Sequence, residues 1–315
     1  MSELHVVFGA GPLGRSVVNE LVRRGKTVRA VSRSGQMAEA PQGVELVAGD
    51  LYNASVVREL SHGAAVAYQC AQPRYHQWVE KFPPLQAAII EGLASSGVRL
   101  VIGENTYMVG DTDGQPLTED LPYAAHTRKG QVRAAMSEAA LAAHRAGKVQ
   151  VTMGRGSDFF GPWALGSTHG ERVFYPALAG KSASFSGKLD LPHTATYIED
   201  FGRALVILGQ REEAMGQAWH VPNDRPQITQ RQFAELVFAE TGHPVKASGM
   251  GRTMLRIGGL FIPEARESIE MLYQFEKPFV VDSSKFEQAF GMKATPMVEA
   301  IKATVAWFRA HPQAK

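Results

Sequence analysis

The chain has 315 residues, of which 44% are hydrophobic and 20% charged, a composition typical of folded globular proteins and unlike that of disordered chains. Its 33 basic and 31 acidic side chains leave a net charge of +2, which argues against a nucleic-acid-binding protein because such proteins concentrate basic residues. A single cysteine, Cys70, excludes an internal disulfide and a zinc site built from cysteines.

The first half of the chain alternates short β-branched segments with longer segments of helical periodicity. The expected strands are residues 4–8, 27–31, 44–48, 64–68, 99–102 and 149–153, and the expected helices are residues 13–24, 53–60, 85–96 and 127–146. Alternation of this kind is typical of right-handed βαβ units. It predicts an α/β fold with a doubly wound parallel sheet and helices on both faces.

The second half is less regular. Expected strands are residues 182–185 and 218–221, and expected helices are residues 198–208, 229–240, 262–273 and 297–309. Thr229 is a suitable N-cap, and Pro263 and Pro296 stand where prolines favour the start of a helix. This part predicts a smaller unit with loops that shape a pocket.

A glycine-rich loop joins the first strand to the first helix. Gly9, Gly11 and Gly14, with Pro12 and Leu13 between them, form the pattern Gly-x-Gly-x-x-Gly. In this context the first glycine permits a tight turn, the second lets a pyrophosphate approach the backbone, and the third allows close packing of helix on strand. The loop therefore predicts a Rossmann-like dinucleotide site, and the alternative is a tight turn without a ligand.

The residues after the second strand indicate which dinucleotide binds. NAD-binding proteins place an acidic residue there to bind the ribose 2′-hydroxyl. This chain instead has Ser32, Arg33 and Ser34, which suit a 2′-phosphate, so NADP(H) is favoured over NAD(H). The alternative is that Arg33 is a solvated loop residue. Arg15 is a further candidate for a phosphate contact.

Two more segments complete the predicted coenzyme site. Asp50 and Leu51 follow the third strand, where a carboxylate can accept a hydrogen bond from the adenine amino group. The alternative role of Asp50 is to cap the helix at 53–60. Ala71 and Gln72, after the fourth strand, are also assigned to the coenzyme.

Taken together, these motifs resemble those of the short-chain dehydrogenase/reductase superfamily, in its extended or atypical, epimerase/dehydratase-like form. The similarity covers nearly the whole chain. It also rests on RGSDFFGP at 155–162, YIED at 197–200, and a C-terminal pattern of DSSK, FG, Pro and WF within 282–308. It implies a dinucleotide-binding domain at 1–162, to which residues 190–222 return, and a substrate domain at 163–315. It also implies a homodimer formed through the alanine-rich helix 127–146.

The chain departs from this family at the catalytic residues. The resemblance implies a Tyr-x-x-x-Lys pair and a Ser or Thr after the fifth strand, because a nearby ammonium makes a phenol a better proton-transfer group. Here Lys129 is preceded by Ala125 at the tyrosine position, and Asn105 takes the place of the Ser or Thr. Tyr123 is displaced by two residues, about 200° of helical rotation.

Three interpretations follow for this site. Lys129 binds the nicotinamide ribose, or Asn105, Thr106 or Tyr107 replaces the missing groups, or the site binds the coenzyme without turnover. The structural alternatives are a solvated helix residue for Lys129, a strand-end cap for Asn105 and a packed aromatic ring for Tyr107.

Four residues are candidates for contact with a substrate. His76 follows the fourth strand and acts as an acid or a substrate contact, or lies in a surface loop. Asp158 stands where the family has Asn, and Phe160 and Trp163 form either an apolar wall of the site or part of the core.

These features predict an NADP(H)-dependent oxidoreductase, or an epimerase/dehydratase-like enzyme, that acts on a small carbonyl or alcohol substrate at an atypical active site. The alternative is a non-catalytic sensor or regulatory protein that binds NADP(H). Residues 1–5 lack the pattern of a signal peptide, and no stretch of about 20 residues is apolar throughout, so we expect a cytoplasmic protein without a membrane partner. The histidines lack ligand spacing, and no metal is expected.

Overall fold

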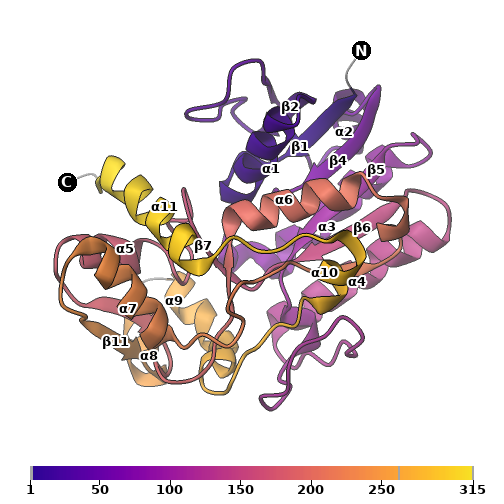
Figure 1. The fold of residues 1–315 in the computed structure, drawn as a ribbon. Helices are drawn as coiled ribbons and strands as arrows, with labels where there is room; N and C mark the ends of the chain where they lie inside the picture. Colours follow the sequence, from indigo (N-terminus) through magenta and orange to yellow (C-terminus); the bar gives the residue numbers. More distant parts are fainter. Residues whose placement is uncertain (1–2, 262, 314–315) are drawn as a thin grey trace. The chain divides into compact units, whose positions relative to one another are not determined.

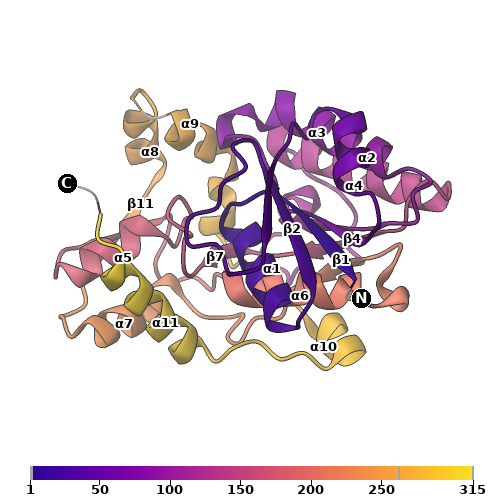
Figure 2. The same cartoon turned by 90° about the horizontal axis from the view of Figure 1, so that it is seen from above.

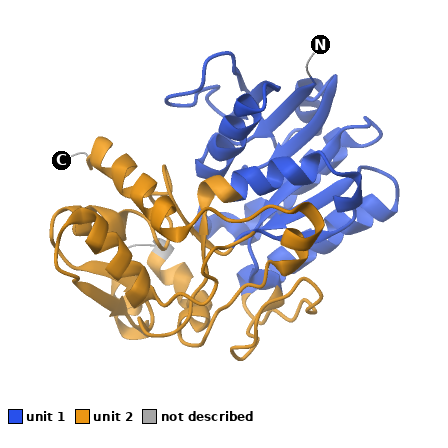
Figure 3. Ribbon diagram, viewed as in Figure 1, with its two compact units in different colours: residues 1–108, 128–156, 201–221 blue, residues 109–127, 157–200, 222–315 orange. Residues whose placement is uncertain are grey.

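The computed structural model describes residues 3–261 and 263–313 (Figure 1). Met1, Ser2 and Ile262, on which the expectations about a signal peptide and the helix at 262–273 partly rest, lie outside the described residues. The chain divides into two compact units (Figure 3). Unit 1 consists of residues 1–108, 128–156 and 201–221, and unit 2 of residues 109–127, 157–200 and 222–315. A domain boundary at residue 162 stays a prediction.

Unit 1 is built on a parallel sheet of seven strands in the order β10-β6-β5-β4-β1-β2-β3. Its strands are β1 (Leu4–Phe8), β2 (Thr27–Ser32), β3 (Glu45–Ala48), β4 (Ala64–Gln69), β5 (Arg99–Glu104), β6 (Val151–Arg155) and β10 (Ala218–His220). The predicted doubly wound α/β fold is confirmed. Because the strand order reverses between β1 and β4, the carboxyl ends of these two strands border the crevice in which such sheets bind ligands.

Helices cover both faces of this sheet (Figure 2). They are α1 (Pro12–Arg23), α2 (Ala54–Leu60), α3 (Trp78–Leu93), α4 (Arg128–Arg145) and, from residue 201 on, α6 (Ile198–Gly209), with the short 3-10 helices η1 (Tyr75–Gln77), η2 (Tyr107–Val109) and η3 (Glu212–Ala214). The helices α2, α3 and α4 pack on one face, over a core that includes Phe8, Ile89 and Met136. On the other face α6 approaches α1 so closely that a Cβ at Gly202 would lie 2.1 Å from the Ser16 hydroxyl oxygen.

The helix α3 begins seven residues before its predicted start. Pro83 and Pro84 lie inside the helix. Prolines remove main-chain donors, so the first turns need another source of stability. Trp78 and Phe82 supply it, because they are buried one turn apart on the same face of the helix and their ring centroids lie 5.3 Å apart. Tertiary packing therefore outweighs the local effect of the prolines.

Unit 2 contains two small parallel sheets and several helices. The strands are β7 (Asp158–Phe160) with β9 (Ala195–Tyr197), and β8 (Ala183–Ser186) with β11 (Ala247–Met250). The helices are α5 (Glu171–Leu178), α7 (Gln230–Thr241), α8 (Arg252–Gly258), α9 (Pro263–Ser268), the 3-10 helix η4 (Ile269–Phe275), α10 (Ser284–Phe290) and α11 (Met297–Ala310). Its core is aromatic and includes Phe174, Phe185, Phe233 and Phe308.

Two helix predictions in unit 2 have different outcomes. Thr229 caps α7 as predicted, and with Gln232 it forms a capping box. The segment expected as one helix over 262–273 instead forms α9 followed by η4. No helix within residues 3–261 and 263–313 has the length and apolar character needed to cross a membrane.

Candidate functional site

The glycine loop of unit 1 leaves open space at the start of α1. Gly9 has a φ of +111°, and a Cβ there would lie 2.6 Å from the main-chain nitrogen of Ala71. A Cβ at Gly14 would lie 1.8 Å from the Gly9 carbonyl oxygen. A Cβ at Gly11 would meet no heavy atom of the described chain within 4 Å. Gly9 and Gly14 therefore serve close packing, whereas Gly11 leaves a cradle at the positive end of the α1 dipole that suits a pyrophosphate.

Gly11→Val is expected to weaken NADPH binding at least tenfold without destabilising the fold. Its φ of −74° is allowed for valine, and the new side chain would occupy the cradle rather than clash with the protein. Fluorescence titration with NADPH and thermal unfolding measure the two effects. Gly14→Ala is the contrasting variant, because its Cβ would overlap backbone and should lower the melting temperature. Wild-type affinity in Gly11→Val would contradict the assignment.

The residues predicted to bind the adenosine half lie at the carboxyl ends of β2 and β3. Arg33 and Ser34 are exposed, and Ser32 Oγ donates to the Gln36 carbonyl and accepts from the Gln36 N–H, which shapes the turn. Burial raises the pKa of the Tyr52 hydroxyl, and the charge of Arg33 opposes that rise. The sequence had not singled out Tyr52.

Asp50 does not cap the helix that follows it. Its Oδ1 accepts from the Tyr52 N–H at 3.0 Å, whereas Asn53 is the N-cap of α2 and accepts from Ser55 and Val56. The capping alternative for Asp50 is therefore wrong, and the exposed carboxylate stays available for the predicted adenine contact. The neighbouring Leu51 is buried.

Arg15 is buried in the first turn of α1 and donates to the Ala38 carbonyl, in the segment that follows Arg33. This bond ties the helix to the turn that carries Arg33. A direct contact between Arg15 and a phosphate stays a prediction.

A second cluster of polar side chains in unit 1 surrounds Lys129. This residue lies in the first turn of α4 and is only 1% exposed, so the alternative of a solvated helix residue is wrong. Its Nζ lies 4.7 Å from the centroid of the Tyr75 ring. The Tyr75 hydroxyl in turn lies 3.4 Å from the hydroxyl of Tyr107. Tyr75 was not among the predicted site residues.

Asn105 and Trp78 hold this tyrosine pair in place. Asn105 Oδ1 accepts from the Tyr107 N–H at 3.3 Å and so caps the end of β5, as one alternative predicted. The ring of Trp78 lies edge-on to Tyr75 at 5.0 Å and tilted to Tyr107 at 6.0 Å. His76, next to Tyr75 in η1, is half-buried, and its contact with a substrate stays a prediction.

A buried ion network lies one helical turn beyond Lys129. Glu104 Oε1 is 3.2 Å from Arg133 Nη2 and accepts from the Ser137 hydroxyl at 2.7 Å, while Glu104 Oε2 accepts from Arg155 Nε at 3.1 Å. Arg133 also covers the ring of Phe82 at 4.6 Å. Arg133 is therefore a buried residue of α4 and not part of a solvated helix face. The sequence contained one indication of the Glu104–Arg155 pair, because these two residues end neighbouring strands and lie opposite each other in the register of β5 and β6.

Unit 2 contains its own buried polar cluster around Asp158. The Asp158 carboxylate lies 2.8 Å from His193 Nε2 and accepts from the Thr168 hydroxyl at 3.2 Å. Burial favours the neutral acid, but the hydrogen bond and charge of His193 outweigh it, and the pKa of Asp158 falls below its usual value. His193 is stacked between Phe275 at 4.3 Å and Phe279 at 5.0 Å.

The two predicted aromatic substrate contacts pack within unit 2. Phe160 is fully buried and contacts Tyr197 and Phe233, so it belongs to the core. Trp163 lies against Trp307 and His311 at 5.0 and 5.5 Å. The core alternative therefore describes Phe160, and Trp163 packs on α11 and the residue that follows it.

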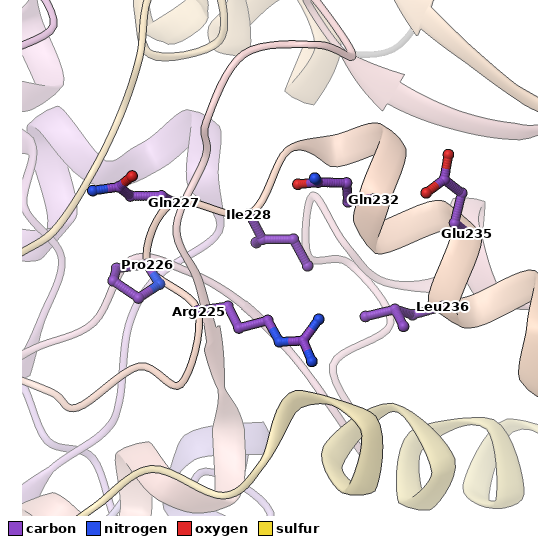
Figure 4. A pocket seen from close by; sticks show the side chains of 7 residues that line it. All are labelled: Arg225, Pro226, Gln227, Ile228, Gln232, Glu235 and Leu236. Atoms are coloured by element: carbon purple, nitrogen blue, oxygen red, sulfur yellow. The ribbon is translucent and has the colours of Figure 1, made fainter.

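A separate shallow hollow lies in unit 2 beside α7 (Figure 4). It is lined by Arg225, Pro226, Gln227, Ile228, Gln232, Glu235 and Leu236. The Arg225 side chain reaches toward its middle, beside Ile228 and Leu236 (Figure 4). Because the hollow contains one guanidinium and one carboxylate, its charge selects no class of ligand, and we assign it no function.

Two buried histidines make stability depend on pH. Burial lowers the pKa of His5 to about 4 and that of His169 to about 3. The unfolded chain takes up protons below about pH 6.5, so the stabilisation is complete above that pH and is lost as pH falls toward these lower values. The free energy of unfolding should drop by about 2 kcal/mol for each histidine between about pH 7.5 and pH 5.

Urea unfolding at the two pH values measures this loss. His169→Phe should remove about half of the pH dependence, since His169 already packs against Phe185 and Phe233. The exposed His62→Gln is the matched control and should leave it unchanged. Equal stability of the wild-type protein at both pH values would contradict the prediction.

Comparison with known proteins identifies the family. Residues 5–221 match the model of the NAD dependent epimerase/dehydratase family. The chain belongs to this family. The match covers more than half of the chain and confirms the resemblance found in the motifs. Among curated proteins, none matches this sequence.

Several solved structures share the fold. An epimerase from Methanothermobacter thermautotrophicus has a TM-score of 0.80 at 18% identity, covering 98% of this chain and 93% of its own. A dTDP-glucose 4,6-dehydratase from Bacillus anthracis, in complex with NAD, has a TM-score of 0.79 at 14% identity, with coverage of 98% and 97%. A UDP-glucuronic acid 4-epimerase from Bacillus cereus, in complex with UDP-glucuronic acid and NAD, has a TM-score of 0.78 at 14% identity, with coverage of 98% and 100%.

Proposed function

We propose that this family member is an NADP(H)-dependent oxidoreductase or epimerase/dehydratase-like enzyme that acts on a small carbonyl or alcohol substrate. The observation that carries the proposal is the open cradle at Gly11 together with the exposed Arg33 at the end of β2. Gly11 and the first turn of α1 hold the pyrophosphate, and Arg33 and Ser34 hold the 2′-phosphate. The bound coenzyme supplies hydride transfer.

The Lys129 cluster supports the catalytic half of the proposal. A buried ammonium over the ring of Tyr75, whose hydroxyl lies 3.4 Å from that of Tyr107, places proton-transfer groups and a positive charge in the same part of unit 1. Lys129 orients the nicotinamide ribose, and Tyr107 acts on the substrate oxygen. Asn105 holds the backbone of Tyr107 in place.

Asp158 bears on the class of substrate. Two of the related structures are described as enzymes of nucleotide sugars, whose substrates carry a diphosphate. The low pKa of Asp158 keeps its carboxylate ionised at neutral pH, but His193 lies 2.8 Å away, so Asp158 is not an isolated negative charge and does not by itself exclude a diphosphate. We propose that Asp158 contacts the substrate by accepting a hydrogen bond from one of its hydroxyl groups.

Coenzyme titration tests this function. We expect NADPH to quench or enhance protein fluorescence at lower concentrations than NADH does. A panel of aldehydes, ketones and nucleotide sugars is then screened for NADPH oxidation. Tight NADPH binding without oxidation by any compound would favour the sensor alternative. No binding of either coenzyme would overturn the proposal.

We also propose that the protein forms a homodimer through α4. Ala135, Ala139 and Ala142 are exposed at helical spacing, so a second helix can approach this side of α4 closely. Light scattering should give twice the mass of one chain, and a monomeric mass would remove this proposal. A cytoplasmic location stays a prediction.

A further inference from the structure

We propose that Tyr107 and Tyr75 form a two-step proton relay that replaces the tyrosine missing at position 125. The ammonium group of Lys129 favours proton release from this pair. Tyr107 exchanges the proton with the substrate oxygen, and Tyr75 resupplies it. The inference rests on the proposed function, because it assigns the proton-transfer groups of that reaction.

The geometry makes the two hydroxyls one unit. Tyr107 begins η2 directly after β5, and Tyr75 begins η1 after β4, so neighbouring strands bring the residues together. Their oxygens lie 3.4 Å apart, which is within reach of a hydrogen bond once either ring shifts slightly. Both side chains are partly exposed, whereas Trp78 beneath them is buried and limits their movement.

Two buried cations favour proton release from this pair. Lys129 Nζ lies over the Tyr75 ring at 4.7 Å. Arg133, one turn further along α4 and also buried, interacts electrostatically with Tyr107. Positive charge at such distances, away from water, stabilises the phenolate that forms when a tyrosine gives up its proton. Glu104 pairs with both Arg133 and Arg155, so this network of two guanidinium groups and one carboxylate keeps a net positive charge. These charges are part of the protein interior, so the effect is present before any ligand binds.

The proton balance of the relay is complete. In the reducing direction the carbonyl carbon accepts a hydride from NADPH, which is oxidised to NADP⁺, and the carbonyl oxygen accepts the hydroxyl proton of Tyr107. The Tyr107 phenolate then takes the hydroxyl proton of Tyr75, and Tyr75 recovers a proton from water. In the oxidising direction each transfer is reversed.

The ionisation of the tyrosines tests the relay without a substrate. Tyrosinate absorbance is followed against pH in the wild-type protein, Tyr75→Phe, Tyr107→Phe and Lys129→Met. We expect the first tyrosinate of the wild type to form at least about one pH unit below the first of Lys129→Met. Tyr75→Phe and Tyr107→Phe should each change the pH at which the first tyrosinate forms. Tyr68→Phe is the control, because burial raises the pKa of Tyr68 out of this range.

Kinetics then separate the relay from simple packing. With a compound that oxidises NADPH, Tyr107→Phe should lower kcat by about 100-fold or more, the usual contribution of a general acid. Tyr75→Phe should lower kcat with little change in KM, and the double variant should be no slower than Tyr107→Phe alone. Unchanged tyrosinate titration in all three variants, or wild-type kcat in Tyr75→Phe, would overturn the relay. If the wild-type protein bound neither coenzyme, the proposed function would be overturned instead.

Discussion

Glu104→Gln is expected to lower the free energy of unfolding by about 3–5 kcal/mol. Glu104 is the carboxylate that lies between the guanidinium groups of Arg133 and Arg155, and all three side chains are almost completely buried. Removal of its charge leaves two buried cations without a counter-ion, and burial of an uncompensated charge is costly. The amide can still accept a hydrogen bond, so the loss reports the charge rather than the shape of the side chain.

Urea unfolding of the variant, followed by circular dichroism, measures this loss. Glu138→Gln is the matched control, because Glu138 lies on the exposed side of α4 and should change stability by no more than about 0.5 kcal/mol. If the Glu104→Gln substitution lowered the free energy of unfolding by less than about 1 kcal/mol, the ion network would not be a main contributor to the stability of unit 1.

Arg33→Asp is expected to weaken NADPH binding by up to about 100-fold and to leave NADH binding nearly unchanged. Charge-assisted hydrogen bonds to a phosphate are worth about 1.5–3 kcal/mol, and the new carboxylate would also repel the 2′-phosphate. NADH lacks that phosphate, and its 2′-hydroxyl can donate to an aspartate at this position. The exposure of Arg33 means that the substitution should not disturb the fold.

Fluorescence titrations with both coenzymes measure the change in preference. Arg58→Asp is the charge-matched control, since Arg58 is an exposed residue of α2 whose Nη2 donates to the Glu91 carbonyl. It should affect the two coenzymes equally and weakly. Equal losses of NADPH and NADH affinity in Arg33→Asp would contradict the assignment of the 2′-phosphate to Arg33.

Local patterns in the sequence were sufficient to predict the strands of the parallel sheet and the glycine loop. Each of these features can be recognised in a short stretch of sequence: the β-branched segments, the glycine spacing and the position of Arg33. The interactions that produce them are between residues close together in the chain. The strand at 4–8 and the loop that leads into α1 lie where they were predicted. Helix ends set by caps were also predictable, as Thr229 shows.

The sequence by itself determined the fold class and predicted where a dinucleotide would bind. Only the tertiary structure decided that Lys129 is buried over Tyr75, that Glu104 unites Arg133 and Arg155, and that α3 starts at Trp78 despite two prolines. Each of these depends on partners from other strands and helices. Whether a charge on a helix faces water or a neighbouring ring depends on those partners, and helical periodicity alone does not contain them.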